Sequence, residues 1–574
     1  MSAERSARLV PWLEGAALAA AAFLVLLCGG EAVRASYHGF LHAALGEAVL
    51  RDGLAPENPY HAGAPLRYYT LYPALGVLLG RAGIGPLWAF AAGNVLAALL
   101  FAPALDALGR AFGLSFRARR GAFLAAVLGF NALGWLGFLL PHDSVMGLRP
   151  VFALRPMTFA ATAFGWDPRL QAFLPKFLNV SSFALALPFA FWAMAEAAAV
   201  GGARAGGPPP RPWRAAVHAA AALALNPLVG AFAGVLMAAW AAPALRAPGR
   251  ARWTWPLAGA LAVGLALPFL LPALAPATHG ESLIEPAFRG TPVTNLVGPL
   301  ALVLIPGVVG AAALRAPARW RWTLGALCAA AVVLLGEMPW GNEYKMARLG
   351  GVLWALPAGV WAAGQWERRG ARRWLAVALL ALSLPTSVAV PYAYVAWGRQ
   401  GEALPLRSAA GALEVHPHGP LRDMPQGWLA VEAAADPAAV LLLNPFRREA
   451  SAERDTIQGE PLAPLLHHSL FVDYPQIHND GMPDLRARLA LAQEFYARPG
   501  AAAGSDPAAA LQRLRDRLPQ RPFLALAADA PPAAGAALLA AGAQRLWSEG
   551  GLSLWLLPPA RPATEPGPGP APGR

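Results

Sequence analysis

The sequence predicts an all-α polytopic membrane domain of about 11 spans, followed by a small extracytoplasmic α/β domain. Of the 574 residues, 56% are hydrophobic and only 14% are charged, whereas soluble proteins average about 25% charged residues. The apolar residues form runs near the ~20 residues that a membrane-spanning helix requires. After residue 396 the chain becomes more polar, and strand-like runs alternate with helical patterns.

The predicted spans occupy the first 396 residues. The long apolar runs are 11–29, 84–109, 121–140, 177–200, 255–275, 293–313, 347–364 and 373–396. The region 214–245 is expected to form two short spans, because Asn226-Pro227 interrupts it and proline removes a backbone donor. With that interruption, the basic connections on either side of the region face the same side of the membrane.

Basic residues predict the orientation of the chain. Arginines gather in short connections, namely 110–120, 204–214, 246–252, 315–321 and 368–373, which is the pattern of cytoplasmic loops. The net charge of +13 therefore reflects topology and does not indicate nucleic-acid binding. The alanine-, arginine-, glycine- and proline-rich composition is typical of high-GC bacterial genomes. We expect a multi-pass protein of a bacterial inner membrane, with its N-terminus in the cytoplasm and its C-terminal domain outside.

The expected domain boundaries follow from these changes in composition. The membrane domain is residues 1–396 and includes a large first outer loop, residues 30–83; the α/β domain is 397–560, and a Pro/Gly-rich tail, 561–574, is expected to be disordered. In the α/β domain, strands are predicted at Val440–Leu443, Leu470–Asp473, Phe523–Ala527 and Leu552–Leu557, with helices around 482–498, 507–518 and 532–541. The other outer loops are 141–176, 276–292 and 337–346.

The first outer loop carries the densest group of candidate residues. His38 and His42 are four residues apart and share one helical face, so they suit metal binding or a base and its orienting partner. The alternative is a structural helix packed on the membrane surface. Arg67 follows a stretch rich in proline and glycine, and a guanidinium there suits a phosphate group.

Residues 66–82, which include Arg67, are mostly apolar but too short to span a bilayer. They predict a helix lying at the outer interface. Tyr68, Tyr69 and Tyr72 would be its aromatic contacts with the headgroup region.

Two further outer loops contain candidate charges. His142 and Asp143 follow the end of a predicted span, and Asp143 is the preferred carboxylate; its alternative role is an interfacial cap. Lys176 and Lys345 are the only lysines, beside 44 arginines, and both lie at predicted outer ends of spans. A site that requires a compact ammonium group would explain lysine at these positions. The alternative is that the two side chains snorkel to the interface.

Lys345 belongs to a polar cluster between two apolar segments. Asn342, Glu343 and Arg348 lie beside it. Ionisable groups at membrane depth are costly and tend to be functional or mutually paired. The cluster therefore predicts either a binding site or an ion pair that shapes the loop.

The order of these elements resembles the GT-C fold of polytopic membrane glycosyltransferases. The resemblance rests on one span, a polar loop with a short helix ending at Gly53, and then APENPYHAGAPLRYY at residues 55–69. It implies a glycosyltransferase-like protein that uses a polyprenyl-phosphate-linked sugar on the extracytoplasmic side, with a lipid, glycan or protein acceptor. A divalent cation, Mg²⁺ or Mn²⁺, is the cofactor that this class admits.

The resemblance implies roles for the candidate residues, with one departure. The catalytic aspartate usual in these enzymes falls on His38 here. Three explanations stay open: His38 is the base, as its ordinary pKa near 6.5 permits; Glu31 replaces the aspartate; or the protein binds a lipid-linked sugar without transferring it. His42 and Asp143 complete the catalytic candidates, and Asp143 would orient the acceptor or hold the cation.

The remaining candidates have binding roles in this interpretation. Arg67, Lys176, Lys345 and Arg348 would bind the donor phosphate, and the supporting residues would be Tyr68, Tyr69, His142, Asn342 and Glu343. The rival to an enzyme is a non-catalytic envelope component that binds lipid-linked glycan. A transporter is disfavoured, because transporters often show internal repeats and charged groups within spans, and here the polar groups gather on one face.

Overall fold

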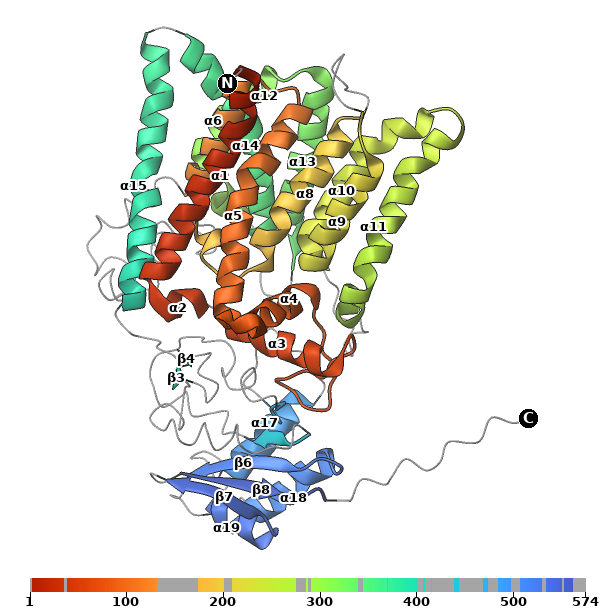
Figure 1. The fold of residues 1–574 in the computed structure, drawn as a ribbon, viewed down its shortest axis with the longest axis vertical. Coiled ribbons are helices and arrows are strands. Elements are labelled where there is room, and N and C mark those ends of the chain that lie inside the picture. Colours follow the sequence, from red (N-terminus) through yellow and green to blue (C-terminus); the bar gives the residue numbers. More distant parts are fainter. Residues whose placement is uncertain are drawn as a thin grey trace. The chain divides into compact units, whose positions relative to one another are not determined.

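A computed structural model of the chain describes residues 3–35, 39–131, 174–200, 209–274, 285–286, 291–338, 344–368, 370–399, 406–407, 414–415, 438–442, 468–472, 484–496, 506–528, 533–549 and 552–560 (Figure 1). The chain separates into two compact units. Unit 1 comprises residues 1–39, 88–270 and 281–403, and unit 2 comprises residues 40–87, 271–280 and 404–574. The first outer loop thus falls largely into the same unit as the C-terminal segment.

Unit 1 is built mainly of helices (Figure 1). They are α1 (Ala3–Cys28), α2 (Gly30–Ala35), α5 (Pro86–Ala111), α6 (Phe116–Leu128), η5 (Leu174–Phe177), α8 (Ser182–Ala198), α9 (Pro212–Leu225), α10 (Pro227–Ala241), η6 (Ala242–Arg246), η7 (Gly249–Trp253), α11 (Thr254–Leu270), α12 (Thr291–Ala312), α13 (Ala316–Leu335), α14 (Tyr344–Glu367) and α15 (Ala371–Arg399). The two-residue strands β1 (Glu285–Pro286) and β2 (Gly336–Glu337) pair antiparallel, and η8 (Leu271–Leu274) follows α11.

Several of these helices are suited to a membrane. Among the described residues, 6 helices are long and apolar enough to cross one, and shorter apolar helices accompany them. The expected multi-pass membrane protein is therefore supported. The number of spans and the side on which each loop lies stay predictions.

The predicted interruption at Asn226-Pro227 is confirmed, because α9 ends at Leu225 and α10 begins at Pro227. Asn226 caps the second helix: its Oδ1 accepts a hydrogen bond from the Val229 amide at 3.2 Å. Its Nδ2 donates to the Ser182 hydroxyl at 2.9 Å. Proline at the first helical position needs no amide partner, so this sequence ends one helix and starts the next.

Unit 2 combines a helical loop segment with a mixed sheet. Its elements are α3 (Gly39–Asp52), α4 (Leu71–Leu79), η1 (Gly80–Ile84), β3 (Leu406–Arg407), β4 (Glu414–Val415), β5 (Val440–Leu442), α17 (Leu485–Phe495), α18 (Pro507–Arg517), β6 (Phe523–Ala528), α19 (Ala533–Ala540), β7 (Gln544–Glu549) and β8 (Leu552–Leu557). The four-stranded sheet has the order β5-β6-β8-β7. Strands β5 and β6 are parallel, and the other pairs are antiparallel.

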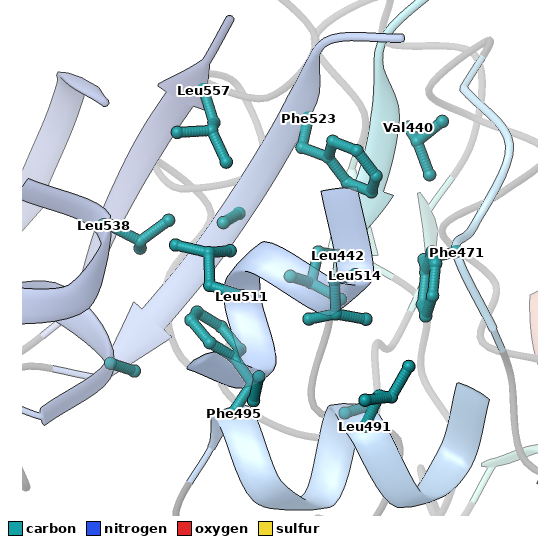
Figure 2. Packing of buried hydrophobic residues seen from close by; sticks show 14 of the residues in the cluster. Val440, Leu442, Phe471, Leu491, Phe495, Leu511, Leu514, Phe523, Leu538 and Leu557 are labelled. Carbon is teal, nitrogen blue, oxygen red and sulfur yellow. The ribbon is translucent and has the colours of Figure 1, made fainter. Parts of the chain in front are cut away.

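One face of this sheet packs against its helices (Figure 2). Phe523, Ala525 and Ala527 alternate along β6 and are buried there, as the two-residue period of a strand requires. Helix α17 contributes Leu491 and Phe495 to the same cluster. The α/β character predicted for this segment is thus present as a small C-terminal mixed sheet.

The helix predicted over residues 66–82 differs from prediction in its start and in one contact. Helix α4 begins at Leu71. Leu66, the predicted first residue, belongs instead to the preceding loop, where its amide is bonded to the Pro56 carbonyl at 2.8 Å. Tyr72 is only 2% exposed, so its expected role at the membrane interface is wrong. A Cβ at Gly46 of α3 would overlap the Pro73 carbonyl, and this close approach of α3 and α4 buries Tyr72.

Candidate functional site

In unit 2, His42 lies within a group of aromatic rings. Its imidazole packs edge-on against Tyr72 at 4.8 Å and against Tyr68 at 5.8 Å between ring centroids. Tyr68 and Tyr69 stack at 4.1 Å, and the Tyr68 hydroxyl donates a hydrogen bond to the Tyr69 oxygen at 2.8 Å. The structure therefore brings together the predicted site residues His42, Tyr68 and Tyr69. His42 is a buried ring on α3.

Arg67 directly precedes the tyrosine pair. It is partly exposed, but its Nε is buried without a hydrogen-bond partner among the residues that the structure describes. A guanidinium carries five donors in a fixed plane, and a buried unpaired donor is costly. An anion with two acceptor oxygens would satisfy this side chain.

The loop before Arg67 is fixed to the C-terminal part of unit 2 by backbone hydrogen bonds. The Leu470 amide donates to the Pro59 carbonyl at 2.8 Å, and the Ala62 amide donates to the Leu470 carbonyl at 2.8 Å. Leu470 itself bridges to Leu441 of β5 in parallel. The loop thus extends the hydrogen bonding of the sheet edge.

Five side chains complete this attachment, and we call them the loop tether: Glu57, His61, Asp484, Arg488 and Arg521. His61 Nε2 lies 2.7 Å from Asp484 Oδ1, and Arg488 Nε donates to Asp484 Oδ2 at 2.6 Å. Arg488 Nη1 also donates to the carbonyls of Ala62 at 2.7 Å and Phe471 at 2.9 Å. Arg521 Nη1 pairs with the Glu57 carboxylate at 3.0 and 3.2 Å.

The loop tether shifts the pKa of two of its members. Burial, together with the charge of Arg488, lowers the pKa of His61, although Asp484 opposes the shift. Burial alone would raise the pKa of Asp484, but the hydrogen bond and charge of Arg488 and the contact with His61 hold it below its usual range. At neutral pH the tether therefore contains a neutral imidazole beside an ionised carboxylate.

In unit 1, the two lysines meet at one aromatic ring, and we call Lys176, Tyr344 and Lys345 the lysine site. Lys176 Nζ lies 4.9 Å from the centroid of the Tyr344 ring, and Lys345 Nζ lies 6.0 Å from it. Lys176 is buried and also lies 5.9 Å from the Phe183 ring. Cations are attracted to the face of such rings, and the Tyr344 ring is a common neighbour of both ammonium groups.

Buried polar groups extend from η5 beside the lysine site. The Tyr394 hydroxyl donates to Asn179 Oδ1 at 3.2 Å, and Asn94 Nδ2 donates to the Asn179 carbonyl at 2.8 Å. Arg348, one turn along α14 from Lys345, is fully buried at 0% exposure. Unit 1 therefore contains a cationic, hydrogen-bonding region formed by segments far apart in the sequence.

Some predicted residues lie outside the described residues. These are His38, His142, Asp143, Asn342 and Glu343. Glu31 lies in α2. The remaining candidates divide between the units: His42, Arg67, Tyr68 and Tyr69 lie in unit 2, and Lys176, Lys345 and Arg348 lie in unit 1.

Metal binding has no support from the part of the chain that is described. No group of three or more His, Cys, Asp or Glu side chains there is placed to hold a metal ion. Asp143, the predicted cation ligand, is outside it.

Sequence reasoning missed several residues of these two regions. Tyr344 stands in the polar cluster with Lys345, and its position beside a lysine was a usable signal. Asp484 and Arg488 have the i,i+4 spacing of a helical ion pair, but nothing in the sequence connects them to His61. Asn94 and Asn179 are polar residues flanked by apolar ones, a pattern that marks buried hydrogen bonding.

No protein-family model matches the sequence, and a search of curated proteins finds no match. Solved structures do show similarity in fold. ArnT from Cupriavidus metallidurans bound to undecaprenyl phosphate has 10% identity and a TM-score of 0.47, covering 93% of this chain and 96% of that chain. Its apo state has 11% identity and a TM-score of 0.45, covering 90% and 93%.

An archaeal structure shows a similar likeness. The Archaeoglobus fulgidus oligosaccharyltransferase in the apo form has 10% identity and a TM-score of 0.45, covering 90% of this chain and 69% of that chain. ArnT and this oligosaccharyltransferase are GT-C membrane glycosyltransferases, the class that the sequence resembles. Identities and TM-scores this low carry no conclusion about activity.

Proposed function

We propose that this protein is a membrane glycosyltransferase whose donor is a sugar linked to polyprenyl phosphate and presented on the extracytoplasmic side. The observation that carries the proposal is the lysine site. The only two lysines of the chain are 169 positions apart by their numbers, yet both lie against the ring of Tyr344. Two ammonium groups beside one ring, one of them buried, favour a ligand that carries negative charge.

A lipid-linked phosphate has the chemistry to occupy such a site. Like charges repel one another, so an anion that binds them lowers their energy. When the sugar leaves its carrier, negative charge develops on the departing phosphate, and fixed cations in a water-poor site stabilise that charge. Arg348, buried one turn away on α14, would add a third positive group.

The remaining roles are proposed from the sequence together with the local geometry. Arg67 would bind an anion in unit 2, and this role is supported by its buried Nε, which has no hydrogen-bond partner among the described residues. His38 or Glu31 would remove the proton of the acceptor hydroxyl, and Asp143 would orient that acceptor. His42 would order Tyr68 and Tyr72 through its edge-on contacts, in place of the direct catalytic role first expected.

The extracytoplasmic placement draws support from unit 2. The first outer loop and the segment around Leu470 share backbone hydrogen bonds, and a membrane cannot separate groups that are bonded to each other. These bonds support placing the loop and the C-terminal domain on one side of the bilayer, with an even number of crossings between them. The basic connections then favour the outside for both.

One observation favours a second function, the binding of lipid-linked glycan without transfer. By the resemblance to GT-C enzymes, the position of their usual catalytic aspartate falls on His38 in this chain. A protein of this kind would keep the phosphate contacts and would lack turnover. The lysine site supports both functions equally, so an activity measurement separates them.

The test measures release of prenyl phosphate from lipid-linked sugars by purified protein in nanodiscs, beside binding of the same donors. For an enzyme, we expect turnover in the wild type, its loss in Lys345→Gln with weaker donor binding, and retention in Arg252→Gln, an exposed arginine of η7. Lys176→Arg tests whether charge alone suffices at the buried position. Saturable binding without turnover, across a broad panel of donors and acceptors, would favour the binder; normal turnover in Lys345→Gln would refute the phosphate site.

A further inference from the structure

A groove runs along α6 in unit 1. Its walls are almost entirely apolar, unlike those of the candidate site. The described residues leave a hollow of about 350 Å³ bounded by α6, α12, α14 and α15. Its apolar lining includes Leu124, Leu128, Leu302, Pro306 and Leu380. Arg117 and Arg120 line it at the start of α6, so the groove has one charged end.

Small residues explain why the groove exists. Helices α6 and α14 approach so closely that a Cβ on Gly359 would overlap the Ala118 carbonyl, and a Cβ on Gly121 would lie 3.1 Å from the Gly359 Cα. This contact holds α6 and α14 together. Ala125 and Ala362 also line the hollow, and their short side chains leave the space between this helix pair and α15 unfilled.

The length of the groove fits one leaflet of a bilayer. Its lining on α6 runs from Arg117 to Gly129, and twelve residues of helix rise about 18 Å. The hydrocarbon core of a bilayer is ~30 Å thick, so one leaflet supplies about 15 Å. An extended acyl chain of a lipid in one leaflet therefore matches the groove.

The lining favours a narrow apolar occupant. A single hydrocarbon chain is long, narrow and apolar, and so it fits a groove of this length and lining.

The charged end complements a negative headgroup. Arg117 is exposed and pairs with the exposed Glu367 at 3.4 Å, an arrangement that contributes little by itself and leaves donors available. Trp366 lines the groove, and the guanidinium of Arg373 stacks on its ring at 4.1 Å. Tryptophan and arginine together are typical of the level of lipid headgroups, and each basic residue near a surface of anionic lipid contributes about 1 kcal/mol.

We propose that this groove is a binding site for an anionic phospholipid, with one acyl chain lying along α6 and the headgroup phosphate at Arg117 and Arg373. Arg120 is already engaged by Glu14 and Asp106 and closes the inner wall. The proposal goes beyond the glycosyltransferase activity and does not depend on it, because it concerns neither the lysine site nor the first outer loop.

The experiment is lipid add-back to the purified full-length chain in detergent, followed by native mass spectrometry. The probes are phosphatidylglycerol and phosphatidylcholine with identical acyl chains. Two changes are tested separately: Arg117→Gln with Arg373→Gln, which removes the charged end, and Ala125→Phe, which fills the hollow. The control is Arg250→Gln, an exposed arginine that does not line the groove.

The wild type and Arg250→Gln are expected to bind phosphatidylglycerol roughly tenfold or more tightly than phosphatidylcholine. The double arginine change should abolish that preference, and Ala125→Phe should weaken binding of both lipids. Thermal unfolding of each variant shows whether it is folded, and the arginine changes test the site even if Ala125→Phe is not. Equal binding of the two lipids by the wild type, an unchanged preference in the double variant, or unchanged binding in folded Ala125→Phe would each overturn the proposal.

Discussion

Replacing Arg488 by alanine is expected to release the first outer loop from the C-terminal part of unit 2. Arg488 is buried and donates to the Asp484 carboxylate and to the carbonyls of Ala62 and Phe471. The change would remove one ionic partner and leave two carbonyls without their donor. Among the described residues, the backbone bonds of Leu470 and the side-chain pairs Arg521–Glu57 and His61–Asp484 would remain to hold the loop.

The expected magnitude follows from these contacts. Removing one partner of a buried ion pair costs about 3–5 kcal/mol, and the lower end applies because the Asp484 side chain is 27% exposed. Each carbonyl left unpaired adds up to ~1–3 kcal/mol where water does not reach it. We therefore expect the docked loop to lose at least about 3 kcal/mol, which corresponds to a rise of roughly a hundredfold or more in the population of the released loop.

Amide hydrogen exchange measures this release directly. Peptides covering residues 57–66 and 468–472 should exchange faster by roughly a hundredfold or more in Arg488→Ala than in the wild type. The matched control is Arg513→Ala on α18, because Arg513 is exposed and pairs with Glu494 on the surface. Equal protection of both peptides in Arg488→Ala and Arg513→Ala would refute the reasoning.

Three further predictions concern single positions. The pKa of His61 is lowered on folding, so the unfolded chain binds more protons, and loop protection should be complete above about pH 6.5 and decline toward pH 5.5. His61→Gln should flatten that decline. A rise in protection on acidification would contradict the predicted direction. Gly63→Ala should destabilise the docked loop by about 1–2 kcal/mol, since Gly63 has φ +82° and a Cβ would lie 2.7 Å from the Leu518 side chain; faster exchange of residues 57–66 measures it, and Gly83→Ala, also at positive φ, is the control outside the tether. Asn226→Ala should lower the thermal unfolding temperature through loss of a cap worth ~1 kcal/mol, whereas Asn226→Ser should retain most of it; equal melting of both variants and the wild type would count against the cap.

The sequence was sufficient for elements with strong local signals. The interruption at Asn226-Pro227 was predicted because proline and a capping residue act on their immediate neighbours. Helix α3 was predicted from its spacing and from Gly53, which follows it at φ +81°. In unit 2, strands β6 and β8 have apolar runs, whereas β7, Gln544–Glu549, is polar and is a strand through its pairing with β8.

The candidate site was less accessible from the sequence because its contacts are long-range. The rarity of lysine drew attention to Lys176 and Lys345, but no local pattern places them on one ring. The burial of His42 depends on the packing of α4 against α3 at Gly46, and no local pattern in the sequence reports that contact. The partners of His61 lie in a segment predicted as a separate domain, and no periodicity within either segment reports that pairing.

The loop tether also sets an order of events during biosynthesis. His61 and Asp484 are 423 residues apart, and at the usual rate of 5–20 residues per second the ribosome needs roughly 20 to 80 seconds to produce the second after the first. During that interval the loop around His61 has left the ribosome while its docking partners do not yet exist. A chain interrupted before α17 would leave this loop permanently exposed to proteases and quality control. Completion of the C-terminal segment is therefore the step at which the first outer loop can dock and become protected.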